Sequence, residues 1–114
     1  MAYTNLDYLR TITEGNKAMI RDMIEMFLQQ VPGFITNLNH LYQTGNYAAL
    51  GKEAHKAKSS LQIMGMTELE LEMKRFQLKT IDGTEVESYP VHIGHFETQC
   101  NGAIAELKVV LATL

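Results

Sequence analysis

The sequence predicts an all-α fold, an up-and-down antiparallel four-helix bundle with a short extra N-terminal helix, in a single domain over residues 1–114. Two observations lead to this prediction. Apolar residues recur at alternating steps of three and four along four long segments, as on helices with one buried face. Glycines and helix-capping residues leave only short connections between these segments, which favours antiparallel neighbours. No strand pattern competes, because the run Val109-Val110-Leu111 is too short.

The N-terminal part of the chain is predicted to hold one short and one long helix. Thr4 can cap the short helix, and Gly15 ends it. Asn16 can cap the long helix, which is expected to end at Gly45. The apolar phase of this helix is the same on both sides of Pro32, although an interior proline usually kinks or interrupts a helix. We therefore expect one bent helix or two collinear halves.

Three more segments complete the bundle. The first is a helix within residues 46–65, where Gly65 serves as the terminating glycine. Thr67 is predicted to cap the next helix, which leads into a turn at residues 81–84 and a polar, mobile loop up to Ser88. Pro90 suits the first turn of the last helix.

The composition is that of an ordinary soluble protein, with 46% hydrophobic and 20% charged residues. The formal net charge of −3 argues against a general nucleic-acid binder. No run approaches the ~18 consecutive apolar residues of a membrane span, and no basic segment followed by an apolar one begins the chain. The single cysteine, Cys100, excludes an intrachain disulfide and fits a reducing compartment. We expect a cytoplasmic protein that binds neither nucleic acid nor membrane.

His55 lies at the centre of the helix predicted within residues 46–65. At ~100° per residue the imidazole is roughly 130° from the middle of the apolar stripe, so it is predicted to face outward. Its neighbours in the same row are small: Gly51 one turn before, Ser59 one turn after and Ala48 two turns before. Glycine inside a helix costs about 1 kcal/mol relative to Ala. A bare surface open to a bulky partner would explain that cost, so Gly51 and Ala48 are interpreted as clearing the approach to His55.

Basic and hydrogen-bonding side chains surround the same ring. In a chain that is acidic overall, residues 51–60 hold three lysines and one acid. Two of these lysines lie three residues before and three residues after His55, and the hydroxyl and amide side chains that follow the histidine can donate hydrogen bonds. We expect an anion on His55 to be stabilised by Lys52, Lys58, Ser59 and Gln62.

The run His55-Lys56-Ala57-Lys58-Ser59-Ser60, closed by Gly65, resembles the motif of histidine phosphotransfer (HPt) domains, His-x-Leu-Lys-Gly-Ser followed by a glycine near the helix end. Ala57 stands for the usual Leu and Ser59 for the usual Gly, which keeps that position small. Residues 6–27 also resemble the short helix and long second helix that precede the motif in many of these domains. Past Lys79 the resemblance is unspecific.

This resemblance implies a phosphorelay intermediate of two-component signalling. His55 would accept a phosphoryl group from the aspartyl phosphate of a response-regulator receiver domain and pass it to another receiver. A hybrid histidine kinase is a further candidate partner. No cofactor of the chain itself is implied, because Mg²⁺ belongs to the receiver. The sequence does not identify the ring nitrogen that is used, although the one farther from the backbone is the more accessible.

A second apolar row on the long helix comprises Met19, Met23 and Met26. One interpretation places these methionines under the first helix, where they fill an irregular gap. The other leaves part of the row exposed near His55 as an adaptable docking patch. The candidate docking residues are Met19, Met23, Leu9 and Ile12.

Other chemistry is less well supported. His92 and His95, with Cys100 downstream, suggest metal ligands, but no second cluster completes a tetrahedral set, so no metal site is predicted. His40 is interpreted as an ordinary surface residue. The acids are spread along solvated faces rather than convergent, and no glycine-rich phosphate loop follows a strand. The sequence therefore favours a phosphocarrier without an ATP site over an enzyme.

The alternative function comes from a different class. A helical interaction module could bind a receiver domain or kinase without carrying phosphate. The presence of both His55 and Lys58 favours the relay, because a scaffold would need neither.

Overall fold

The computed structural model describes residues 2–114, which form an antiparallel helical bundle of 43 × 21 × 20 Å. Its long helices are α2 (Lys17–Gln43), α3 (Tyr47–Ile63), α4 (Thr67–Asp82) and α5 (Tyr89–Thr113). The short α1 (Asp7–Ile12) precedes α2, and a 3-10 turn, η1 (Val86–Ser88), precedes α5. α2 and α4 each pack against both α3 and α5, so the four long helices close a ring. The predicted four-helix bundle with an extra N-terminal helix is confirmed.

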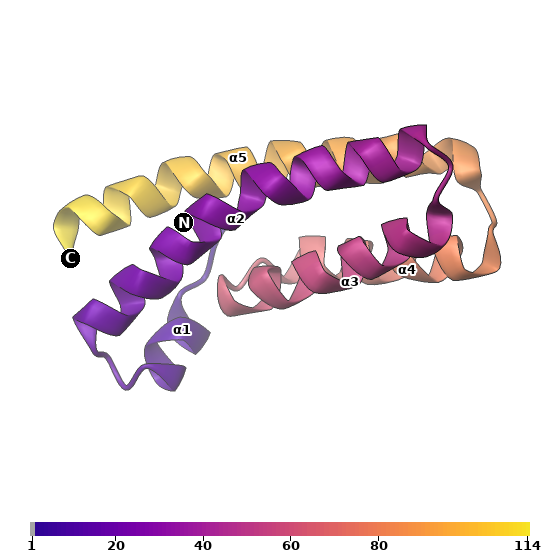
Figure 1. Cartoon of the computed structure of the whole chain (residues 1–114). Coiled ribbons are helices and arrows are strands. Elements are labelled where there is room, and N and C mark those ends of the chain that lie inside the picture. Colours follow the sequence, from indigo (N-terminus) through magenta and orange to yellow (C-terminus); the bar gives the residue numbers. More distant parts are fainter. Residues whose placement is uncertain (1) are drawn as a thin grey trace.

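Figure 1 shows how unequal helix lengths shape the molecule. α2 and α5 run side by side and extend beyond the shorter pair of α3 and α4. α1 folds back at the end where α2 begins. One core of buried apolar side chains lies inside the ring, and the fully buried members include Leu9, Ile24, Phe76, Tyr89 and Phe96.

The helix starts follow from local capping. Asn16 Oδ1 accepts a hydrogen bond from Met19 N at 3.0 Å, and Asn46 Oδ1 accepts one from Ala49 N at 3.3 Å. The predicted Asn16 cap of α2 is confirmed, and the structure shows that Asn46 caps α3 in the same way. α2 continues through Pro32 as one helix that bends near its middle (Figure 1), because the proline is exposed and the buried stripe runs on without a change of phase.

Three local predictions were wrong. Thr4 does not cap α1, which begins after Leu6 without a side-chain cap; its hydroxyl binds Glu106 instead. Thr67 is the first residue of α4 rather than its cap, and Met66 occupies the cap position without a side-chain bond. The connection before α5, expected to be a loop, contains η1. A hydroxyl residue near a helix start can cap that helix, but a tertiary contact engages Thr4 and the helix register places Thr67 inside α4.

The N-terminal segment is tied across the end of the bundle. The backbone N–H of Tyr3 and of Thr4 donate to the Glu106 carboxylate at 2.8 Å and 3.1 Å, and Asn5 N donates to Met64 O at 3.1 Å. Burial raises the pKa of Glu106, but these backbone hydrogen bonds outweigh it and leave the pKa below its ordinary value. The segment thereby links α5 to the end of α3.

A polar cluster joins α4 to α5. Glu72 Oε2 accepts hydrogen bonds from Nδ1 of His92 at 2.9 Å and Nδ1 of His95 at 2.8 Å. Lys79 Nζ lies 3.0 Å from His92 Nε2, and the His92 ring stacks on Phe76. An ammonium only donates, so His92 Nε2 accepts from Lys79 and its Nδ1 carries the proton given to Glu72. His92 and His95 thus serve to link α5 to α4 through Glu72.

Candidate functional site

His55 is exposed on α3, as the helical periodicity predicted. Its Nδ1 lies 3.3 Å from Oε1 of Gln77, a half-buried residue of α4. An amide oxygen only accepts, so this contact places the ring proton on Nδ1 and leaves the lone pair of Nε2 free. The outer nitrogen therefore carries the free lone pair of the ring.

Gln77 is the residue that sequence analysis missed. It directly follows Phe76 of the buried stripe of α4, so it lies on the edge of that stripe. A polar residue beside an apolar stripe is a sequence signal for a side chain near a helix interface, and it marks Gln77 as a candidate. Nothing in the sequence pairs it with His55, however, because that pairing depends on how α3 and α4 pack.

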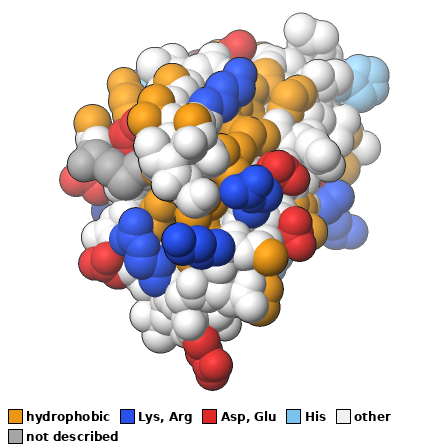
Figure 2. All heavy atoms as spheres, turned by 90° about the vertical axis from the view of Figure 1, so that its left-hand side faces the viewer, with side chains coloured by type: hydrophobic (Ala, Val, Ile, Leu, Met, Phe, Trp, Pro, Cys, Tyr) orange, Lys and Arg blue, Asp and Glu red, His pale blue; other side chains and the backbone are white. Residues whose placement is uncertain are grey.

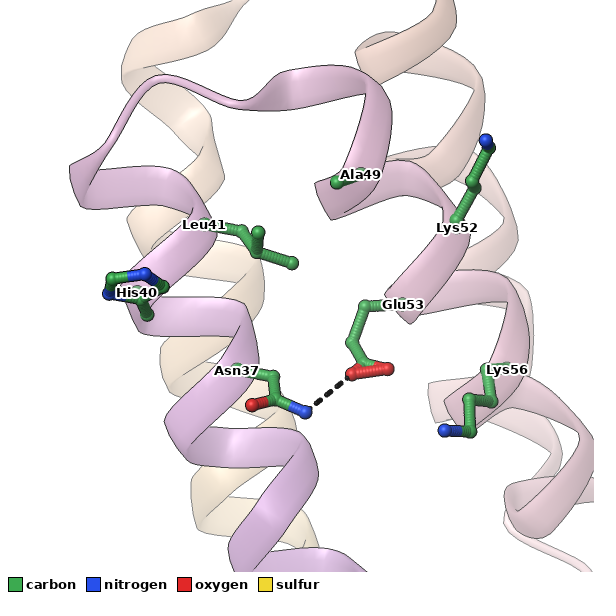
Figure 3. Close-up of a pocket in the computed structure, with 7 residues that line it drawn as sticks. All are labelled: Asn37, His40, Leu41, Ala49, Lys52, Glu53 and Lys56. Atoms are coloured by element: carbon green, nitrogen blue, oxygen red, sulfur yellow. Dashed lines mark hydrogen bonds between the residues drawn. The ribbon is translucent and has the colours of Figure 1, made fainter.

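The basic side chains beside His55 are available for an anion. Lys52 is exposed and Lys58 is half-buried, and neither forms an ion pair within residues 2–114. Glu53, the one acid within residues 51–60, points toward α2, where its Oε2 accepts a hydrogen bond from Asn37 Nδ2 at 2.9 Å. Figure 3 shows this bond across the groove between α2 and α3, with Lys52 and Lys56 on either side of Glu53 along α3. This surface keeps a local positive charge.

Ser59 and Gln62, two of the predicted anion-stabilising residues, are exposed. Ser60, by contrast, turns toward α2, where its hydroxyl donates to Gln30 Oε1 at 3.0 Å. Ser59 also lines a hollow of about 160 Å³ between α2 and α3, together with Met23 and Met26. The side of Ser59 that faces α2 thus meets an apolar surface.

Gly51 is not part of an open approach, and this interpretation was wrong. It is buried, and a Cβ at this position would overlap Oγ1 of Thr80 on α4 and lie 3.4 Å from Thr80 Cβ. The glycine makes room for a neighbouring helix of the same chain. Ala48, two turns before His55, is exposed. It borders a hollow of about 390 Å³ that Lys52 and Gln77 also line.

The four candidate docking residues separate by burial. Leu9 is fully buried, so its assignment to a docking surface was wrong: the side of α1 that carries it faces the core. Ile12 is 41% exposed and Met19 is 47% exposed, whereas Met23 is half-buried against the core. Met26 is 56% exposed. The interpretation that the methionines fill a gap under the first helix is therefore wrong for Met19 and Met26.

Figure 2 looks onto the end of the bundle where α1 and the start of α2 lie. Hydrophobic side chains group on this surface, with Lys and Arg side chains around them. Ile12 at the end of α1 and Met19 in the first turn of α2 belong to elements of this end. Met19, Met23 and Met26 follow one another at steps of four and three residues along α2, and the last two line the hollow beside Ser59.

The remaining histidines and the cysteine do not form a second site of this kind. His40 is exposed on α2, and His92 and His95 bind Glu72. Cys100 is buried in the core, and burial raises the pKa of its thiol to about 12. Among residues 2–114, no three or more His, Cys, Asp or Glu side chains are grouped so that they could hold a metal ion.

The fold and the site together define a class: a helical bundle that displays a histidine on an exposed helix face, with a free ring nitrogen and with unpaired lysines beside it. A model of the Hpt domain family matches residues 22–108. The chain therefore belongs to the Hpt domain family. Neither the curated proteins nor the solved structures contain a significant match to it.

Membership of this family implies histidine phosphotransfer in a phosphorelay. Hpt domains are phosphocarrier modules rather than kinases, and they interact with receiver domains and kinases. No helix within residues 2–114 combines the length and the apolar character needed to cross a membrane.

Proposed function

We propose that this chain is a phosphorelay intermediate whose phosphoryl acceptor is Nε2 of His55. The observation that carries the proposal is the contact between His55 Nδ1 and Gln77 Oε1 on an exposed helix face. It assigns the ring proton to Nδ1, so the lone pair is on Nε2, the outer nitrogen of the exposed ring. A phosphodonor can therefore reach the lone pair without rearrangement of the bundle.

The transfer balances without a base from this chain. The Nε2 lone pair attacks phosphorus of a receiver's aspartyl phosphate, the N–P bond forms, and the P–O bond breaks as the aspartate leaves with the electron pair. The ring gains positive charge while its proton stays on Nδ1, and Gln77 Oε1 accepts the hydrogen bond from it. The reverse reaction returns the phosphoryl group to a second receiver.

Charge stabilisation and positioning supply most of the catalysis in phosphoryl transfer, because the transition state is loose. We assign the stabilisation of the phosphoryl oxygens to Lys58, Ser59, Gln62 and Lys52. All four lie on the His55 side of α3, where Lys52, Ser59 and Gln62 are exposed and Lys58 is half-buried. Neither lysine forms an ion pair with a carboxylate within residues 2–114. The Mg²⁺ of the reaction belongs to the receiver's acidic pocket, and this chain needs no cofactor of its own.

The docking surface of the proposal is the apolar region that reaches Ser59, which lies one helical turn from His55 on α3. A receiver would contact Ile12, Met19 and Met26 and the hollow beside Ser59, where flexible methionines adapt to the partner's side chains. A hybrid histidine kinase would bind the same surface through a receiver domain of its own. The unpaired thiol of Cys100 supports a cytoplasmic location for this exchange.

The experiment is phosphorylation of the whole chain by a phosphorylated receiver domain, followed by native mass measurement. We expect a gain of one acid-labile phosphoryl group, absent from His55→Gln and retained by His40→Gln. His40 is the matched control because it is exposed on α2 and forms no side-chain hydrogen bond within residues 2–114. If wild-type chain stays unlabelled beside a control acceptor that is charged, the relay is excluded and an interaction module that only binds the receiver remains.

A further inference from the structure

A close contact between α3 and α4 lies one helical turn from His55. Gly51 is buried in the interior of α3, where neither a turn nor a positive φ calls for glycine. Its missing side chain leaves a notch, and Thr80 of α4 fills it: a Cβ on residue 51 would overlap Thr80 Oγ1. The glycine is thus explained by the distance between two helices of this chain.

Thr80 is held in this notch. Its side chain is buried, and Oγ1 donates to the backbone oxygen of Gln77 at 2.6 Å. A β-branched side chain in a helix has few rotamers, so the hydroxyl cannot swing away freely without losing this bond. The backbone of Gln77 and the side chain of Thr80 therefore form one rigid unit that rests on Gly51.

The Gly51–Thr80 contact and the His55–Gln77 contact are neighbours along the interface between α3 and α4. Gly51 and His55 are four residues apart on α3, and Thr80 and Gln77 are three residues apart on α4, so in both helices they share a face. The chain directions are opposite, which pairs Gly51 with Thr80 and His55 with Gln77. At 1.5 Å per residue the two pairs are roughly 6 Å apart along the helices.

We propose that the Gly51–Thr80 contact sets the spacing at which Gln77 holds the proton on Nδ1 of His55, and so keeps Nε2 as the reactive nitrogen. Gly51 and Thr80 are positioning residues in this scheme, because they act through Gln77. The bond is already long at 3.3 Å, so a small separation of the helices breaks it. An imidazole in water favours the proton on Nε2, which would leave the free lone pair on Nδ1, facing α4. This inference rests on His55 being the phosphoryl acceptor.

The test reads the tautomer directly. Long-range ¹H–¹⁵N correlation spectra of the full chain at about pH 9, where an ordinary imidazole is neutral, report which ring nitrogen carries the proton. His40 supplies the reference for an exposed ring in the same spectrum. Wild-type His55 is expected to be mainly Nδ1–H. Gln77→Leu and Gly51→Ala should each shift the tautomer ratio about two- to tenfold toward Nε2–H, the range expected for loss of one hydrogen bond.

A paired substitution makes the test specific. In Gly51→Ala/Thr80→Ala the overlapping hydroxyl is gone, and the new methyl faces the Cβ of residue 80 at 3.4 Å and the backbone oxygen of Gln77 at 3.8 Å, both ordinary contact distances. This double variant should return to the wild-type tautomer and phosphoryl-transfer rate. Gly94→Ala is the matched control, because a Cβ on that helical glycine meets nothing within 4 Å, and it should leave the tautomer unchanged.

The outcomes separate this inference from the proposed function. A Gly51→Ala chain with the wild-type tautomer, or a double variant without recovery, overturns the inference while His55 remains the acceptor. If Gly51→Ala alone fails to fold, the double variant decides. A folded double variant in which His55 has the wild-type tautomer supports the inference, and one in which His55 has the tautomer ratio of His40 overturns it. A wild-type chain that takes no phosphoryl group on His55 refutes the relay without altering the tautomer measurement.

Discussion

Gly65, which closes the motif helix, offers a quantitative test of the N-terminal segment. Its φ is +65°, and a Cβ would overlap the backbone oxygen of Asn5 and lie 2.8 Å from the carbonyl carbon of Asn5. Gly45 has nearly the same conformation, with φ +71°, but a Cβ there meets nothing within 4 Å. The two glycines therefore share the backbone strain of an alanine substitution and differ in the steric clash.

The magnitudes follow from these environments. An L-residue in the left-handed region costs roughly 1–2 kcal/mol, which is the whole expected effect of Gly45→Ala. Gly65→Ala also displaces Asn5, which then loses the hydrogen bond from its backbone N–H to Met64 O. This loss lowers the free energy of unfolding by about 0.5–1.5 kcal/mol more. The expected total for Gly65→Ala is about 1.5–3.5 kcal/mol, so its Tm should lie about 2–8 °C below that of Gly45→Ala.

The assay is urea and thermal unfolding of both variants, followed by far-ultraviolet circular dichroism. Gly33→Ala serves as a control, because that helical glycine is free of contacts and its substitution should stabilise by up to about 1 kcal/mol. If Gly65→Ala costs no more than Gly45→Ala, the N-terminal segment does not press on Gly65 and this reasoning is refuted.

Four further predictions concern the site and the ends of the bundle. Ser59→Trp should slow transfer from a receiver about 10–100-fold at unchanged stability, because the indole fills the approach beside His55; an unchanged rate would refute the docking geometry. Lys58→Ala should slow transfer by up to about tenfold without abolishing it, since one charged donor is lost at a partly exposed position, and a variant with no kinetic effect would contradict the charge argument. Cys100, with its pKa raised to about 12 by burial, should resist iodoacetamide at about pH 8 until urea unfolds the chain; rapid labelling of native protein would contradict its burial. Glu106→Gln should lower Tm at neutral pH, and the difference from wild type should close as the pH falls below ~4.

The sign of the Glu106 effect follows from linkage. Its pKa is lower in the folded state, so the stabilising contribution is fully present above the unfolded pKa and disappears as pH falls through the folded pKa. A difference in Tm that stayed constant from neutral to acidic pH would mean that the carboxylate charge does not hold the N-terminal segment.

Much of this architecture was readable from local patterns. Asn16 and Asn46 cap their own helices, and the apolar stripe continues through Pro32 because helix periodicity depends only on neighbouring residues. His55 faces outward for the same reason. Local predictions failed where a hydroxyl near a helix start bound a distant partner, as Thr4 does with Glu106.

The bundle, the helix that carries His55 and the outward direction of its ring were predictable from residue spacing alone. The contact of Gln77 with that ring, the position of Gly51 under Thr80 and the burial of Leu9 became known from the packed helices. Periodicity fixes where a side chain points relative to its own helix axis. The neighbour it meets there depends on how all the helices share one core.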